Sequence, residues 1–210
     1  MKNASKHADS LKALVKKIVK DRPERPEMNP LTAIVRGTLS MDADDMLVDE
    51  AMAKLDTEYV DLNELRVATE LEVADLVGDH HARIDEKSTV IRTTFHAIFD
   101  REQVLKLDRV KELKKAEVRQ FLKDLGTLPQ FVEAFVALHA FDTAAFPVDE
   151  ATLGYLIDEE ILEEGTTAED AANFLEHQLK ADEVYGTYLA IREKALAHER
   201  KPAKAGAKKK

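Results

Sequence analysis

The sequence predicts an all-α protein, and three observations lead to that prediction. Apolar residues recur at the spacing of one helix face through most of the 210 residues. Ala, Leu, Glu, Lys and Asp dominate, and only 7 Gly and 6 Pro interrupt them, which favours helices over a many-stranded sheet. With 44% apolar and 34% charged residues, the composition is that of a globular helical protein, and 210 residues suffice for one sizeable core or for two small helical lobes that share a cleft.

Amphipathic patterns predict helices joined by short turns. A first helix around residues 11–19 is followed by a stiff connector containing Pro23, Pro26 and Pro30. Further helices are predicted near residues 31–39, 45–55, 69–77, 85–99, 116–125, 130–141, 153–157, 166–179 and 183–199. Thr166 and Glu169 have the spacing of a capping box. We therefore divide the chain into an N-terminal helix and connector (1–28), a helical domain (29–199) and a Lys-rich tail (200–210) that we expect to be disordered.

The net charge of −10 conceals an uneven distribution. Residues 1–25 carry eight Lys and Arg against three acids, and residues 200–210 carry six Lys and Arg and no acid. Residues 26–199 hold 17 basic and 38 acidic side chains. Such a body repels a phosphate backbone unless its few cations gather on one face. The basic tail is therefore either a nucleic-acid anchor or a solubilising extension.

The absence of cysteine excludes disulfides, thiolate nucleophiles, zinc–thiolate sites and Cys-ligated iron–sulfur clusters. No apolar run approaches the roughly 18 residues of a membrane helix, and the first residues lack an apolar signal core. We expect a cytoplasmic protein without membrane contact, associated with the nucleoid if it binds DNA. The neighbouring His80 and His81 lack further ligands nearby, so we expect neither a metal nor another cofactor.

Residues 116–141 contain two predicted helices joined by the turn LGTLP, and PVD follows at 147–149. The stretch from Leu125 to Asp149 resembles, without a gap, the segment of the endonuclease III family of DNA glycosylases in which a helix-hairpin-helix, L-P-G-V-G-x-K-T-A, leads to V-D-T-H. NPLTAIVRGTLSMDADD (29–45) is similar to the family's opening helix, and ARIDEKSTVIRTTFHAIF (82–99) to its helix with K-A-x-x-I. The alternative is that amphipathic helices of similar length match by chance.

The resemblance implies a two-lobed helix-hairpin-helix DNA glycosylase-like fold. Residues around 45–140 would form one lobe, and the N- and C-terminal helices would form the other. Asp149 and Phe131 would lie in the cleft between them. DNA would be the partner.

Asp149 takes the place of the family's catalytic aspartate and is the candidate catalytic residue. A carboxylate there can activate a water or stabilise positive charge on the sugar as the glycosidic bond breaks. The family's lysine nucleophile corresponds to Phe131, so lyase chemistry through this position is excluded. Val-Asp-Glu-Ala-Thr also opens a predicted helix, and Asp149 can alternatively serve as an N-cap alone.

Other positions depart from the family. Pro129 replaces a glycine whose N–H would bind a phosphate, and Asp42 replaces the glutamine that fills the gap left by a flipped base. Glu150, Ala151 and Gly154 replace polar and cationic groups beside the aspartate. The DNA contacts that remain as candidates are Gly126, Thr127, Gln130, Lys87, Lys208, Lys209 and Lys210.

Two functions fit these observations. The first is a monofunctional DNA glycosylase that uses Asp149 in base-excision repair and has no lyase activity. The alternative is a catalytically inactive homologue that acts as a DNA-binding or protein-interaction module.

Overall fold

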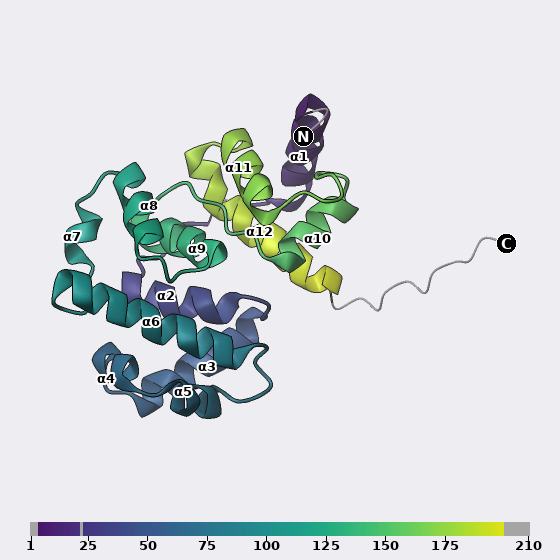
Figure 1. Cartoon of the computed structure of the whole chain (residues 1–210). Helices are drawn as coiled ribbons and strands as arrows, with labels where there is room; N and C mark the ends of the chain where they lie inside the picture. The colour runs from purple at the N-terminus through teal and green to yellow at the C-terminus, as the bar shows by residue number, and fades with distance from the viewer. Residues whose placement is uncertain (1–3, 22, 200–210) are drawn as a thin grey trace.

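The computed structural model describes residues 4–21 and 23–199, and within these ranges it contains twelve α-helices and no strand (Figure 1). The helices are α1 (Ala4–Ile18), α2 (Pro30–Ser40), α3 (Asp45–Glu58), α4 (Leu62–Val67), α5 (Glu70–Val77), α6 (Ile84–Glu102), α7 (Asp108–Lys111), α8 (Lys115–Asp124), α9 (Gln130–Phe141), α10 (Glu150–Asp158), α11 (Ala168–Gln178) and α12 (Ala181–Glu199). The predicted all-α class is confirmed. None of the helices in the described ranges is long and apolar enough to cross a membrane.

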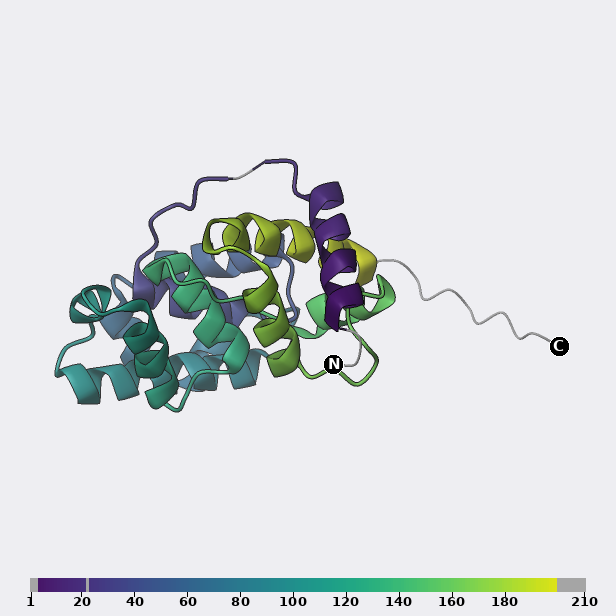
Figure 2. The same cartoon turned by 90° about the horizontal axis from the view of Figure 1, so that it is seen from above.

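The helices form two lobes. One lobe contains α2 to α9, with α6 running between the α4–α5 pair and the α8–α9 hairpin, and the other contains α1, α10, α11 and α12 (Figure 1). Helix α1 lies against α12 at the far end of the second lobe, and the extended connector returns from it to α2 (Figure 2). Leu11 and Leu14 are buried, so the first helix is part of the core.

Helix α2 lies at the centre of the molecule because nearly all of its sides are apolar. Asn29 caps its first turn by accepting a hydrogen bond from Leu31 N–H at 2.9 Å, and Pro30 suits the first helical position. Gly37 allows α9 to approach closely, since a Cβ at that position would lie 2.8 Å from the Phe135 ring. A helix that is apolar on most sides is buried, and α2 packs against α3, α6 and α9.

Three local details differ from the sequence prediction. Residues 62–67 form a separate short helix before α5, and α7 is an additional turn of helix. The N-cap of α11 is Thr167, which accepts from Asp170 N–H at 3.1 Å, rather than Thr166. The reason is that the Thr166 hydroxyl donates to the Glu163 carbonyl at 2.7 Å and so belongs to the preceding turn.

Candidate functional site

The α8–α9 hairpin has the turn geometry expected for its sequence, with the glycine one position earlier than in the resembling family. Gly126 adopts a positive φ of 66°, which glycine accepts without strain, and it is exposed. Leu125 and Leu128 are buried beneath the turn. Pro129 occupies the N-cap of α9 and provides no side-chain cap. The exposed part of the turn therefore consists of Gly126 and the first residue of α9.

Two predicted DNA contacts in this hairpin differ in exposure. Gln130 is exposed at the start of α9. The Thr127 hydroxyl lies 2.8 Å from the Thr94 hydroxyl of α6, so this side chain fastens the turn to the lobe. The Gln130 side chain has no comparable hydrogen bond to α6 in the described part of the chain.

Lys87 requires a correction. We expected it to contact DNA, but its side chain is 1% exposed and donates hydrogen bonds to the carbonyls of Leu39, at 3.2 Å, and Met41. Its ammonium also lies 3.2 Å from His81 Nδ1. Burial lowers the pKa of Lys87 to about 8. The residue closes the C-terminal end of α2, which carries unpaired carbonyls and attracts a cation, and it does not face solvent.

The neighbouring His80 and His81 lie in different surroundings. His81 is buried, and burial together with the nearby Lys87 lowers the pKa of its imidazole to about 4. His80 is exposed, with Nε2 3.8 Å from a Glu50 carboxylate oxygen. Within residues 4–21 and 23–199, no three His, Cys, Asp or Glu side chains are grouped so that they could hold a metal ion.

Lys208, Lys209 and Lys210, the predicted contacts in the tail, lie outside the described residues. Their role as a DNA anchor stays a prediction.

Phe131 and Asp149 are both at the core side of their helices. Phe131 is 6% exposed, and its ring centroid is 6.1 Å from that of Phe135. Asp149 is the N-cap of α10, where one carboxylate oxygen accepts from Thr152 N–H at 2.9 Å. The capping role is therefore present in the structure, and it leaves the second oxygen for another partner.

That partner is Arg192 of α12, which the sequence did not identify as a site residue. Its Nη1 lies 3.4 Å from the second oxygen of Asp149, and both side chains are 5% exposed. Arg192 also contacts the Asp45 carboxylate at 3.2 Å and donates to the carbonyls of Ser40, at 3.3 Å, and Ala43, at 2.8 Å. One cation thus connects α10, α12 and the turn after α2, and the only sequence signal was its place on the apolar face of α12.

The turn after α2 carries three acids, and each has a defined role. Asp42, whose backbone has a positive φ of 51°, pairs with Arg83. Asp44 is the N-cap of α3 and accepts from Leu47 N–H at 3.0 Å. Since Asp45 pairs with Arg192, the turn is held to α12 as well as to α3.

An aromatic pocket of about 270 Å³ opens next to Arg192, between the connector, α2, α9 and α12. The Phe135 and His139 rings stack with centroids 4.0 Å apart, and Tyr185 and Tyr188 meet His139 edge-on at 5.4 and 5.7 Å. Arg192 lines the same pocket. We refer to it as the aromatic pocket, defined by Phe135, His139, Tyr185, Tyr188 and Arg192.

Two polar atoms of the aromatic pocket have no hydrogen-bond partner within the described protein. They are His139 Nε2 and the Tyr188 hydroxyl, both buried. Burial, with the charges of nearby arginines, lowers the pKa of His139 to about 3, so its imidazole is neutral. Burial raises the pKa of Tyr188, which therefore keeps its proton. Both atoms lie beneath the surface of the pocket, so a ligand would reach this hydroxyl and this imidazole only after the side chains around them move.

Comparison with known proteins identifies the fold. No family model matches the sequence, and no curated protein matches it. Solved structures do match. Endonuclease III in a trapped covalent intermediate with DNA has a TM-score of 0.69 and 16% identity, over 91% of this chain and 85% of that chain. Clostridium acetobutylicum 8-oxoguanine glycosylase/lyase in complex with DNA has a TM-score of 0.66 and 14% identity, over 92% and 70%.

H. pylori 3-methyladenine DNA glycosylase bound to 1,N6-ethenoadenine has a TM-score of 0.65 and 13% identity, and it covers 95% of this chain and 99% of its own. The last two are named for different bases, 8-oxoguanine and 3-methyladenine, and at 13–16% identity what the three proteins share with this chain is the arrangement of helices. The chain therefore has the fold of the helix-hairpin-helix DNA glycosylases.

Proposed function

We propose that this chain is an endonuclease III-like protein of DNA base-excision repair, a monofunctional DNA glycosylase that uses Asp149 and has no lyase activity. The observation that carries the proposal is the connection between Asp149 and the aromatic pocket. Arg192 contacts the Asp149 carboxylate and lines the pocket, so one guanidinium joins a carboxylate to a pocket of aromatic side chains.

The chemistry follows from these groups. Once the site opens, a base removed from the duplex can stack on the rings of the aromatic pocket, and the His139 and Tyr188 polar atoms, which are buried without a partner among the described residues, can bind its edge. As the glycosidic bond breaks, positive charge develops on the sugar, and the Asp149 carboxylate stabilises that charge or orients the attacking water. Because Asp149 is enclosed and bound to Arg192, the cleft has to open when DNA binds.

Phe131 decides the type of reaction. A glycosylase with lyase activity needs an amine that forms a Schiff base with the sugar, and a phenyl ring cannot do this. Borohydride treatment during incubation with damaged DNA should therefore trap no covalent complex. A trapped adduct would show that another amine serves as the nucleophile.

The decisive experiment is an excision assay. The protein is incubated with duplexes carrying oxidised, alkylated or deaminated bases, and abasic sites are counted after chemical cleavage. Excision that Asp149→Asn abolishes supports the proposal, since asparagine keeps an oxygen for the N-cap but removes the charge. Glu150→Gln is the matched control. Glu150 is exposed beside Asp149, so this substitution should leave the rate of excision unchanged. No excision across the panel refutes activity on those lesions.

A non-excising DNA-binding module is the second candidate. The Asp149–Arg192 contact favours it, because the guanidinium offsets the negative charge that catalysis needs. In that case binding would depend on the hairpin residues Gly126 and Gln130 and on the tail. Undamaged duplex is then bound without excision, and deletion of residues 200–210 reduces both the affinity and its dependence on salt. A salt dependence unchanged by the deletion would contradict the role of the tail.

A further inference from the structure

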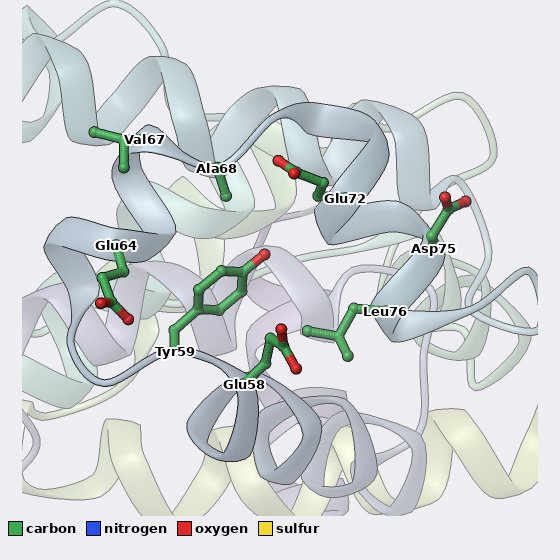
Figure 3. Close-up of a pocket in the computed structure, with 8 residues that line it drawn as sticks. All are labelled: Glu58, Tyr59, Glu64, Val67, Ala68, Glu72, Asp75 and Leu76. Atoms are coloured by element: carbon green, nitrogen blue, oxygen red, sulfur yellow. The ribbon is translucent and has the colours of Figure 1, made fainter.

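A groove of about 560 Å³ lies on the first lobe, between the end of α3, α4 and α5 (Figure 3). It is lined by Glu58, Tyr59, Glu64, Val67, Ala68, Glu72, Asp75 and Leu76. Tyr59 lies across its middle, with Glu58 on one side and Glu72 on the other (Figure 3). We refer to this surface as the α3–α5 groove. Its size is that of a binding site rather than of a packing defect.

The segment that forms the α3–α5 groove has exposed apolar side chains: Val67 lines the groove, and Val60 and Leu71 are the sequence neighbours of the lining residues Tyr59 and Glu72. Val60, Val67 and Leu71 are 90%, 64% and 66% exposed, and they lie within twelve consecutive residues. Single exposed apolar side chains are ordinary, but several beside one groove mark an interaction surface. Covering them would remove apolar area from water, so the groove presents a surface that a partner with apolar side chains can bury.

The charge of the α3–α5 groove is of one sign. Four of its eight lining residues are acidic and none is basic. Glu64 and Glu72 accept hydrogen bonds at 2.7 Å from the backbone N–H groups of Val60 and Thr69, which hold these carboxylates in place. Burial, with the charges of Glu72 and Glu58, raises the pKa of the Tyr59 phenol. A cationic ligand would therefore be favoured at this surface.

Two further carboxylates are available for such a ligand. Glu58 and Asp75 are exposed, and neither forms a hydrogen bond or an ion pair within the described part of the chain. Both line the groove, Glu58 from the end of α3 near Tyr59, and Asp75 from α5 at the edge of the groove with its carboxylate directed outward (Figure 3). As exposed carboxylates at the groove and its edge, they can pair with cations of a ligand that occupies the groove.

The α3–α5 groove is separate from the candidate site. Helices α4 and α5 pack on one side of α6, whereas the α8–α9 hairpin lies on the other side (Figure 1). None of the groove residues belongs to the aromatic pocket. A partner could thus occupy this groove without covering the hairpin, and the carboxylates would repel a phosphate backbone there.

We propose that the α3–α5 groove binds a short basic amphipathic helix of a partner protein. Its apolar side would cover Val67 and Leu71, and its Lys or Arg side chains would meet Glu58 and Asp75. The tail of this chain, residues 200–210, fits less well. It has the positive charge, but its apolar residues are Ala and Pro, which cannot cover exposed Val and Leu.

The test uses the full chain and a synthetic 15-residue peptide with Leu on one helical face and Lys on the other, labelled for fluorescence anisotropy. The peptide should bind in a salt-dependent manner. Glu58→Gln/Asp75→Asn should weaken it by about tenfold, as expected for the loss of two charge pairs, and Leu71→Ser should weaken it as well. Asp108→Asn/Glu112→Gln is the control, because it removes the same charge from exposed positions at α7. Circular dichroism verifies that each variant is folded.

Three outcomes would overturn the proposal. The first is equal binding of a scrambled peptide of identical composition, which would show attraction to the net charge alone. The second is equal weakening by the α7 control, which would place the peptide elsewhere. The third is tighter binding of a peptide of residues 200–210, which would make the tail of this protein the occupant.

Discussion

Arg192→Met removes the cation that joins α10, α12 and the turn after α2, and we expect it to destabilise the fold strongly. Asp149, whose side chain is 5% exposed, would keep only its hydrogen bond from Thr152 N–H. Removing one partner of a buried ion pair costs about 3–5 kcal/mol, because the remaining charge stays buried without compensation. The contact with Asp45 adds little, since Asp45 is 68% exposed and well screened.

This magnitude can be measured by urea unfolding of the full chain. For a protein of this size, a loss of about 3–5 kcal/mol corresponds to a fall in Tm of roughly 6–20 °C. Adding Asp149→Asn to Arg192→Met removes the unpaired charge and should restore about 1–2 kcal/mol of the loss, whereas in the wild-type background Asp149→Asn should be destabilising. A loss below about 1 kcal/mol for Arg192→Met, or strict additivity of the two changes, would refute the argument.

Three further changes test the packing and the local structure. Replacing His139 with Phe should reduce the acid sensitivity, of which buried His81 retains a share: the folded-state pKa of His139, about 3, lies below the unfolded value, so the stability it contributes is present above pH 6.5 and lost as pH falls, by about 3 kcal/mol at pH 4. The prediction would be contradicted if lowering the pH from 7 to 4 reduced the free energy of unfolding equally in the wild type and in His139→Phe. Gly37→Ala should cost about 1–3 kcal/mol despite its better helix propensity, because the new methyl group would meet the Phe135 ring at 2.8 Å, and an unchanged urea midpoint would show that the ring can move. Thr69→Ala should cost about 1 kcal/mol by breaking the capping box with Glu72, whereas Thr69→Ser should cost less; equal effects would argue against the hydroxyl as the cap.

The aromatic pocket and Arg192 show why the position of Asp149 alone does not define a reaction. An aspartate at a helix start is a good N-cap in any helical protein, and Asp149 fulfils that role. Whether Asp149 takes part in a reaction depends on its surroundings. Here its neighbour is the Arg192 guanidinium, and the position expected for a nucleophilic amine holds Phe131. Proteins of one fold can catalyse different reactions or lack catalytic activity. The excision assay distinguishes these cases for this chain.

Local sequence was sufficient for much of the fold. The apolar pattern placed the starts of two helices near residues 31 and 69, and the structure shows them capped by Asn29 and by Thr69 with Glu72, residues within one turn of each start. The hairpin of α8 and α9 was predicted from two amphipathic patterns and a five-residue turn. The boundary at Thr166 was wrong by one residue, since either of two adjacent threonines can cap and only the preceding turn decides between them.

The sequence by itself determined the helical class, the order of the longer helices and the absence of an amine at Phe131, and it offered an N-cap as one of two roles for Asp149. The tertiary structure decided where the charges lie. Lys87 was expected to face DNA but lies buried under the end of α2, and Arg192 was not expected in the site but binds Asp149 within the second lobe and the turn after α2 in the first. The physical reason is that spacing along the chain fixes which face of a helix is apolar, whereas the partner of a buried charge comes from residues distant in sequence, 43 positions away for Asp149 and Arg192.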